Sequence, residues 1–270
     1  MRLLLVLVVT AGCYDPTPAI GVRCGTDDAC PAELACLGER CVPPGTVNDA
    51  TPDVPPPPPP IDAPPPPMLF VDSFDRPDGD TLGNGWIEKT PATFSLRSQA
   101  VARVLSTSYR NNLVYRPASE DLRDVELSIV MRPMTVPVGS PQIFVRAQAS
   151  TIATSNTYDG YLMYVSGGSD DVVIGRQLGA VFVVELTRFT VAPAFDTTST
   201  YRMTLRAVGE SPVSLRGSVE RMTPTGWTLV GTASVDDTAA NRITGAGSVG
   251  FSGSTDDPGY TYDDVTRTPL

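Results

Sequence analysis

Short apolar runs with a period of two recur from Met68 to the end of the chain. Clusters of Gly, Pro, Asn, Asp or Ser separate these runs about every 8 to 12 residues. This alternation puts successive side chains on opposite faces of a β-strand, and no segment shows a convincing helical period. The pattern therefore predicts that residues 68–270 form one all-β domain of many short strands.

A single sheet of this size would leave one apolar face uncovered, so we expect two packed antiparallel sheets. In residues 201–208 and 213–220, apolar side chains alternate with polar ones such as Arg202 and Arg216, which predicts one wet face. The expected strands are 69–74, 93–97, 100–105, 112–116, 124–132, 142–149, 160–166, 172–177, 181–186, 201–208, 213–220, 227–235, 247–251 and 260–266.

A proline-rich stretch, residues 43–67, separates this domain from the first part of the chain. Proline fixes φ and lacks a backbone donor, so the stretch cannot form helix or sheet. A polyproline II stalk of this length reaches about 50 to 80 Å, at about 3.1 Å per residue. We expect it to act as a spacer, and recognition by a proline-binding partner is the alternative.

Residues 1–12 have the features of an export signal: Arg2, an apolar run from Leu3 to Val9, and small residues before Cys13. The Ala-Gly-Cys ending resembles the lipobox of bacterial lipoproteins, although Thr10 departs from the usual leucine. The resemblance implies that Cys13 is lipidated and anchors the chain to a membrane. Tyr14 follows where aspartate would signal inner-membrane retention, which implies the outer membrane or cell surface. The alternative is a plain secreted protein.

The segment 13–42 contains four further cysteines, namely Cys24, Cys30, Cys36 and Cys41. An even set at this density in an exported chain predicts two disulfides. Three pairings are possible and the sequence does not choose between them, but we expect the crossed one, Cys24 with Cys36 and Cys30 with Cys41. A zinc site is the alternative, and it would need paired C-x2-C spacing and a reducing compartment.

The charge and composition exclude several functions. The formal net charge is −10 and no basic block occurs, so the electrostatic term that drives nucleic-acid binding is missing. The chain has no histidine, which excludes Ser-His-Asp and Cys-His catalysis and His-ligated zinc. We expect no organic cofactor and no nucleic-acid partner.

Two motifs give the β domain a specific resemblance. The block LFVDSFDRPDGDTLGNGW spans Leu69 to Trp86, and GSVGF at 247–251 is followed by YTYDDV at 260–265. Both resemble the opening and closing strands of concanavalin A-like (LamG-like) jelly-roll domains. The resemblance covers 68–270 and implies a two-sheet antiparallel jelly-roll sandwich with its first and last strands paired. It does not fix a function, because lectins, glycanases and lyases share that fold.

Glycanases of this fold place carboxylates in an E-x-D-x-E pattern on one strand, and the chain has no such triplet. The glutamates of the β domain are Glu88, Glu120, Glu126, Glu185, Glu210 and Glu220, and no two share a face of one expected strand. We therefore expect a non-catalytic domain. A hydrolase with carboxylates from separate segments is the alternative.

The resemblance also implies a structural calcium ion where the first and last strands meet. The aspartates in those segments are Asp72, Asp75, Asp263 and Asp264, and calcium prefers such oxygen ligands. The alternative is that Asp75, Asp78 and Asp80 build turns and that Asp263 pairs with Arg76 or Arg267.

Binding of a sugar needs aromatic faces and planar amide or guanidinium donors. In residues 142–149, Ile143, Val145 and Ala147 are expected to face the core, which puts Phe144 and Arg146 on the other side. The candidate ligand-binding residues are Phe144, Arg146, Gln148, Tyr158, Tyr161 and Arg176. Trp86 and Trp227 are expected to be packing residues.

Together these features predict a lipid-anchored surface protein with a recognition or adhesion domain. Its expected partner is a glycan or cell-envelope polysaccharide, which rests on fold analogy alone. A polysaccharide-active enzyme and a purely structural envelope protein are the alternatives.

Overall fold

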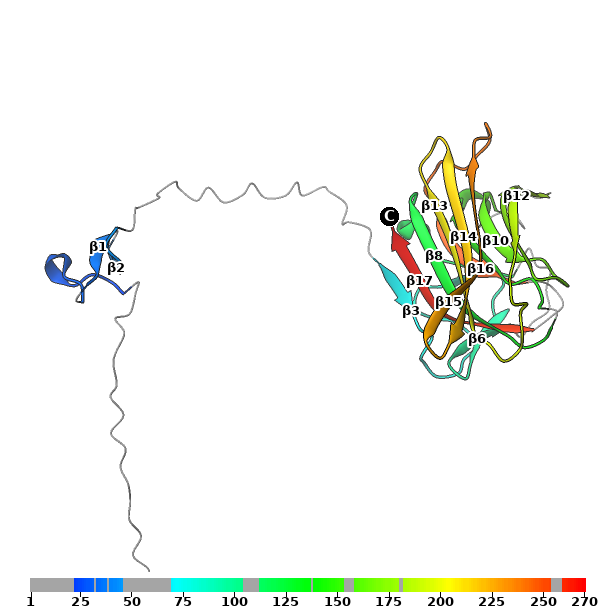
Figure 1. Ribbon diagram of the computed structural model, residues 1–270, viewed down its shortest axis with the longest axis horizontal. Helices are drawn as coiled ribbons and strands as arrows, with labels where there is room; N and C mark the ends of the chain where they lie inside the picture. Colours follow the sequence, from blue (N-terminus) through cyan, green and yellow to red (C-terminus); the bar gives the residue numbers. More distant parts are fainter. Residues whose placement is uncertain are drawn as a thin grey trace, which may run out of the picture. The chain divides into compact units, whose positions relative to one another are not determined.

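The chain forms two compact units, divided near Pro64 and Pro65. A computed structural model describes residues 22–31, 33–37, 39–45, 69–103, 112–136, 138–152, 158–179, 182–253 and 259–270 (Figure 1). Cys13 and most of the proline-rich stretch lie outside these ranges. Within them, no helix is long and apolar enough to cross a bilayer.

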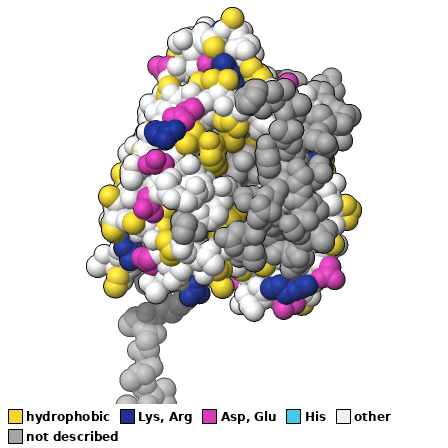
Figure 2. Space-filling view, turned by 90° about the vertical axis from the view of Figure 1, so that its right-hand side faces the viewer, with side chains coloured by type: hydrophobic (Ala, Val, Ile, Leu, Met, Phe, Trp, Pro, Cys, Tyr) yellow, Lys and Arg dark blue, Asp and Glu magenta, His cyan; other side chains and the backbone are white. Residues whose placement is uncertain are grey.

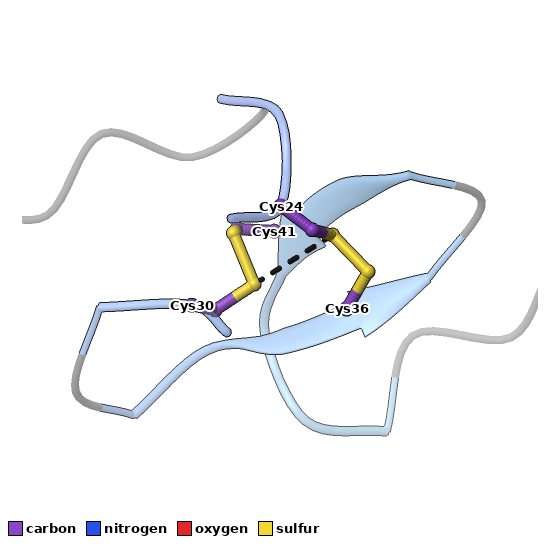
Figure 3. Close-up of a disulfide and its surroundings, with 4 residues drawn as sticks. All are labelled: Cys24, Cys30, Cys36 and Cys41. Carbon is purple, nitrogen blue, oxygen red and sulfur yellow. Dashed lines mark hydrogen bonds between the residues drawn. A yellow bond between two sulfur atoms is a disulfide. The ribbon is translucent and has the colours of Figure 1, made fainter. Parts of the chain in front are cut away.

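The first unit is a small disulfide-bonded hairpin. It contains the 3-10 turn η1 (Thr26–Asp28) and the antiparallel strands β1 (Ala35–Leu37) and β2 (Arg40–Val42). Disulfides join Cys24 to Cys36 and Cys30 to Cys41, which confirms the crossed pairing (Figure 3). The sulfur atoms of Cys24, Cys30 and Cys36 lie within 4.8 Å of one another. They are disulfide sulfurs and not the thiolates that zinc needs.

The second unit is a sandwich of two antiparallel sheets, as predicted. One sheet has the order β12 (Phe182–Thr190), β11 (Asp171–Leu178), β10 (Gly160–Val165), β9 (Gln142–Ala147), β16 (Ser248–Ser252), β7 (Leu113–Tyr115) and β4 (Ile87–Glu88). The other has the order β15 (Gly226–Asp237), β14 (Val213–Thr223), β13 (Tyr201–Val208), β8 (Val125–Pro133), β17 (Tyr260–Pro269), β6 (Ala100–Arg103) and β5 (Phe94–Arg97). The strand β3 (Phe70–Asp72) also pairs with β17, which makes the second sheet eight-stranded.

The jelly-roll prediction is therefore confirmed, and each of the fourteen expected ranges contains a strand. The first strand of the domain, β3, lies beside the last one, β17, with Asp72 opposite Val265. The sequence did not predict the short strand β4, the helix α1 (Ala149–Ile152) or the 3-10 turn η3 (Ala118–Glu120).

The main core lies between the two sheets. On β13, Tyr201, Met203, Leu205 and Ala207 are buried in it, while the side chains between them face solvent. Phe251 of the facing sheet packs against Trp86 with ring centroids 5.3 Å apart. The alternation on β13 and β14 is thus realised as predicted, and the outer face of the eight-stranded sheet is wet.

A second apolar cluster covers the other face of the seven-stranded sheet. Phe144 and Leu162 project into this cluster from β9 and β10, where they meet Ile152 of α1 and Tyr158. All four side chains are buried. The seven-stranded sheet is consequently covered on both faces at β9 and β10, whereas the outer face of the eight-stranded sheet is polar.

Candidate functional site

Five of the six candidate ligand-binding residues are buried: Phe144, Arg146, Tyr158, Tyr161 and Arg176. The aromatic ring of Phe144 lies 4.6 Å from that of Tyr158, whose hydroxyl accepts a hydrogen bond from Gln142 at 2.6 Å. Burial raises the pKa of Tyr158 above the ordinary range of tyrosine. The expected binding face on β9 is therefore corrected: α1 and Tyr158 cover it.

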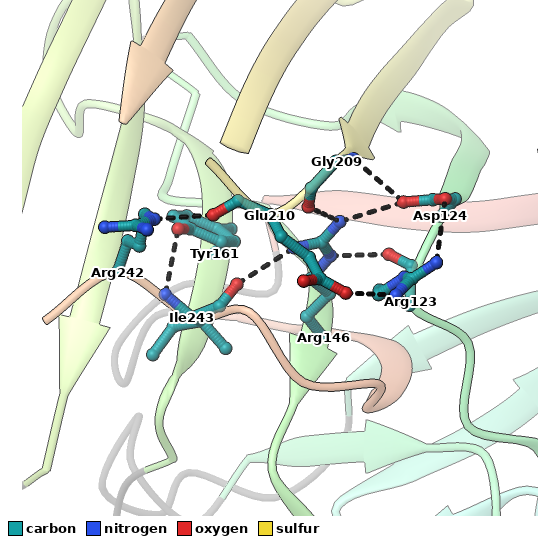
Figure 4. A network of polar contacts seen from close by, with 8 residues as sticks. All are labelled: Arg123, Asp124, Arg146, Tyr161, Gly209, Glu210, Arg242 and Ile243. Atoms are coloured by element: carbon teal, nitrogen blue, oxygen red, sulfur yellow. Dashed lines mark hydrogen bonds and ion pairs between the residues drawn. The ribbon is translucent and has the colours of Figure 1, made fainter. Parts of the chain in front are cut away.

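Arg146 enters the sandwich because its backbone has a positive φ of 53°, next to an irregularity in the β9–β16 pairing. Its guanidinium donates to the carbonyls of Arg123, Ile243 and Gly209 and to the Asp124 carboxylate (Figure 4). The side chain is fully buried, and burial lowers the pKa of Arg146. The Arg146 side chain thus links these chain segments through hydrogen bonds, and its burial keeps it from contacting a ligand in solution.

Tyr161 and Arg176 form another interior group. Both contact Asp237: the Arg176 guanidinium lies 2.7 Å from each carboxylate oxygen, and the Tyr161 hydroxyl donates at 2.9 Å. The backbone N–H of Ile243 donates to the Tyr161 hydroxyl at 3.0 Å. These contacts join β10 and β11 to Asp237 of the other sheet and so stabilise the packing of the two sheets, although Nε of Arg176 is buried without a hydrogen-bond partner among the described residues. Gln148 is half-buried and donates to the carbonyls of Arg146 and Ala246.

The four aspartates expected to hold calcium do not form one coordination sphere. Both oxygens of Asp72 are engaged by Arg76, and Trp86 donates to one of them at 2.8 Å. Among the residues with a described placement, the only group of three metal-ligating side chains with ligand atoms within 4.8 Å is the cysteine group. A calcium ion held by Asp72, Asp75, Asp263 and Asp264 together does not fit this arrangement.

Asp75 and Asp263 instead line one small hollow of about 290 Å³. Burial and the nearby carboxylates of Asp264, Asp75 and Asp72 raise the pKa of Asp263 to about 6. Neither of the alternative ion pairs forms, because Arg76 binds Asp72 and Arg267 binds Glu120. Asp78 and Asp80 do serve the local turns: Asp78 accepts from the Ser98 N–H, and Asp80 pairs with Arg97.

The open polar face of the eight-stranded sheet carries a broad hollow. This hollow, the sheet groove, has a volume of about 470 Å³ and crosses β8, β13, β14 and β15. Its lining residues are Glu126, Ser128, Arg202, Thr204, Arg206, Arg216, Ser218, Glu220 and Leu229. They alternate with the core residues of the same strands, so the buried half of each strand holds the groove residues in place.

One end of the sheet groove combines charged, apolar and aromatic groups. Arg202 pairs with Glu220 at 2.6 Å, and its guanidinium stacks on the ring of Trp227 at 4.6 Å from the centroid. Leu229 lies two residues further along β15 and is 52% exposed. Planar guanidinium, hydroxyl and aromatic groups side by side are the chemistry that binds sugars.

The two carboxylates of the sheet groove belong to glutamates on different strands. Glu126 lies opposite Arg206 and Glu220 lies opposite Arg202, on the two strands that flank β13. Two strand spacings and four residues along the strand separate their Cα atoms by about 16 Å. Catalytic carboxyl groups of glycosidases lie about 5 to 9.5 Å apart, so these two glutamate side chains would have to extend towards each other, whereas the Glu220 carboxylate is paired with Arg202.

Sequence reasoning placed Arg202, Thr204, Arg206 and Arg216 on the wet face but did not choose them as the site. The polar side chains that alternate with apolar ones in residues 201–208 and 213–220 could have indicated this surface. Among the coloured residues on the side of the domain in Figure 2, acidic and basic side chains are interspersed with apolar ones.

Comparisons with known proteins find similar architectures at low sequence identity. No protein-family model and no curated protein matches the chain. The VIP36 exoplasmic/lumenal domain, in its Ca²⁺- and Man3GlcNAc-bound form, is 12% identical over 66% of this chain and 81% of its own, with a TM-score of 0.44. Lectin II from Ulex europaeus is 14% identical over 75% of this chain and 99% of its own, with a TM-score of 0.46.

An enzyme is also among these solved structures. The GH43 protein BlXynB from Bacillus licheniformis is 14% identical over 74% of this chain and 39% of its own, with a TM-score of 0.46. These identities and TM-scores assign the chain to none of the three families.

Proposed function

We propose that the β-sandwich is a non-catalytic glycan-recognition domain that binds through the sheet groove. The observation that carries this proposal is the groove of about 470 Å³ on the wet face of the eight-stranded sheet. Its hydroxyls and guanidinium groups suit sugar hydroxyls, and the ring of Trp227 stacks on Arg202 beside the groove.

The first part of the chain supports display of this domain at the cell surface. In this proposal the export signal directs the chain out of the cytoplasm, and lipidated Cys13 holds it at the outer membrane. The proline-rich stalk then spaces the domain from the membrane. The partner is a glycan, such as a cell-envelope polysaccharide.

The two alternatives have weaker support. A glycoside hydrolase needs two carboxyl groups close together, whereas Glu126 and Glu220 have Cα atoms about 16 Å apart and the Glu220 carboxylate is paired with Arg202. A purely structural envelope protein would need no hollowed polar face, and the sheet groove is such a face.

A glycan array probed with the purified full chain tests the proposal. The variant Ser218→Trp fills the sheet groove, and Val184→Trp adds the same bulk on β12 of the other sheet, where the side chain is 43% exposed. We expect defined glycans to bind the native chain and the Val184 variant, and binding to fall about tenfold or more in the Ser218 variant. Silence of the native chain on the array, or equal binding by all three proteins, would contradict the proposal.

A further inference from the structure

Two arginines lie directly opposite each other on the wet face. Arg206 of β13 is in register with Arg216 of β14, and both side chains are exposed. Directly opposed residues of an antiparallel pair have Cβ atoms about 4.5 to 5.5 Å apart, and like charges there are destabilising. An anion bound between the two guanidinium groups would offset this repulsion.

None of the residues that the structure describes supplies that anion. Arg206 and Arg216 have no hydrogen-bond or ion-pair partner among the described residues, whereas Arg97, Arg188 and Arg202 each pair with a carboxylate. Glu126 lies opposite Arg206 on β8 but forms no ion pair with it. In a chain of net charge −10, carboxylates are abundant, so two adjacent unpaired arginines form a local exception.

The same two arginines lie where two hollows adjoin. They line the sheet groove and also a second hollow of about 390 Å³, whose other lining residues include Ser214, Ser234 and Asp236. Hydroxyl groups therefore flank the arginine pair on both sides, with Thr204 and Ser218 in the sheet groove. A polymer bound across both hollows would have one of its units near the two arginines.

We infer that the Arg206–Arg216 pair binds the carboxylate of an acidic sugar, so that the ligand of the sheet groove is a uronate-containing polysaccharide. Guanidinium groups bind carboxylates through paired, charge-assisted hydrogen bonds. The inference rests on the proposed function of the groove and names its ligand class.

The surrounding carboxylates restrict how acidic the ligand can be. Glu126 lies next to Arg206, and Asp236 lies about 8 Å from Arg216 between Cα atoms, one strand across and two residues along. A polymer with a carboxylate on every sugar would bring further negative charges beside these groups. We therefore expect polymers in which neutral sugars separate the acidic ones to bind better.

Calorimetric titration of the full chain with three oligosaccharides tests this inference. Hyaluronan oligomers carry a carboxylate on alternate sugars, polygalacturonate oligomers carry one on every sugar, and chitin oligomers are neutral. We expect hyaluronan to bind most tightly, and Arg206→Gln with Arg216→Gln to weaken it by about tenfold or more. Binding by the native chain should also weaken at high salt.

The matched control is Arg97→Gln with Arg188→Gln, which removes the same charge from exposed ion pairs outside the two hollows. Arg206→Lys with Arg216→Lys keeps the positive charge but loses the planar guanidinium group that can donate two parallel hydrogen bonds. We expect this variant to bind hyaluronan with intermediate affinity. Equal hyaluronan binding by the native chain and the Gln double variant would overturn the inference. Dextran sulfate bound more tightly than hyaluronan through the same arginines would overturn the choice of carboxylate.

The neutral oligosaccharide separates this inference from the function on which it rests. Chitin oligomers that bind the native chain and the Gln double variant equally, while hyaluronan binds neither, would leave a glycan-binding groove without acidic specificity. Absence of binding by any glycan on the array would remove the proposed function itself.

Discussion

Trp86 donates its indole N–H to a carboxylate oxygen of Asp72 at 2.8 Å, although the two residues are 14 positions apart. Arg76 holds the same carboxylate with hydrogen bonds of 2.8 and 3.0 Å. All three residues belong to the motif that opens the β domain. Their contacts join that motif to β3, which pairs with the last strand, so the motif stabilises the closure of the sandwich.

Asp72→Asn should lower the free energy of unfolding at pH 7 by about 2 to 3 kcal/mol, because it removes a buried charge from Arg76 and Trp86. Burial raises the pKa of Asp72, but hydrogen bonds from Arg76, the Phe74 N–H and Trp86 outweigh this and lower it to about 2. The folded-state pKa is thus below the unfolded one, so the stabilisation is present above about pH 4 and is lost as the pH falls towards 2.

Urea unfolding at pH 7 and pH 2 checks this prediction. The difference between the native chain and the variant should shrink at pH 2. Asp80→Asn is the control, because it breaks the exposed pair with Arg97 and should change stability by about 0.5 kcal/mol or less. A difference that is the same at both pH values would contradict the assigned role of the Asp72 charge.

Asp263→Asn should raise the free energy of unfolding at neutral pH, whereas Asp72→Asn lowers it. The pKa of Asp263 is raised to about 6, so the folded state favours the protonated carboxyl group. Protonation of Asp263 therefore contributes to the stability of the fold at low pH, and this contribution is lost as the pH rises from about 4 to 6. Asparagine removes the charge and can still accept the hydrogen bond that the Asp264 N–H donates at 2.9 Å.

We therefore expect Asp263→Asn to stabilise the domain by about 1 kcal/mol at pH 7.5 and to have no effect at pH 4. Thermal melts in a chelator at the two pH values measure this. A loss of stability at pH 7.5 would show that the Asp263 charge is satisfied by a partner.

Reduction of the disulfides should affect only the first unit. The four described half-cystines lie between Cys24 and Cys41, and residues 68–270 contain no cysteine. Each disulfide closes a short loop, worth about 3 kcal/mol in the chain-entropy view. Hydrogen exchange under a reducing agent should rise in peptides from residues 22–45 and stay unchanged in peptides of β8, β13 and β14. Increased exchange in those strands would mean that the two units depend on each other.

Cys13→Ala should abolish lipidation of the chain. We expect the native chain to take up radiolabelled palmitate and to sediment with membranes in a lipidating bacterial host. The variant should lose the label, and it should either keep its signal peptide or appear in the soluble fraction. Label retained by the variant, or a native chain without label, would contradict the lipid anchor.

Most of the fold was predictable from the sequence because alternation reports which face of a strand is buried. Leu205 and Ala207 are buried and Arg206 is exposed, as the pattern on 201–208 predicts. The disulfide pairing was expected on weaker grounds, since spacing alone leaves three choices. The strand β4 is two residues long and carries too few side chains to show a period.

The candidate site was not predictable in the same way. Alternation placed Phe144 opposite the main core, but it does not report that α1 and Tyr158 cover that side. Arg146 points inward because of a positive φ that no residue type at this position signals. Arg206 and Arg216 were assigned to the wet face, yet their opposition depends on the register of β13 and β14, which local sequence does not fix.

The most direct test of ligand binding in the sheet groove is the fluorescence of Trp227. The chain has two tryptophans, and Trp86 is buried at 8% exposure, whereas Trp227 stacks on Arg202 of the groove. Titration with a glycan that binds by calorimetry should change the tryptophan emission of the native chain, and Trp227→Phe should lose this change. A glycan that binds with no change in emission, or an unaltered change in the variant, would place the ligand elsewhere and contradict the account.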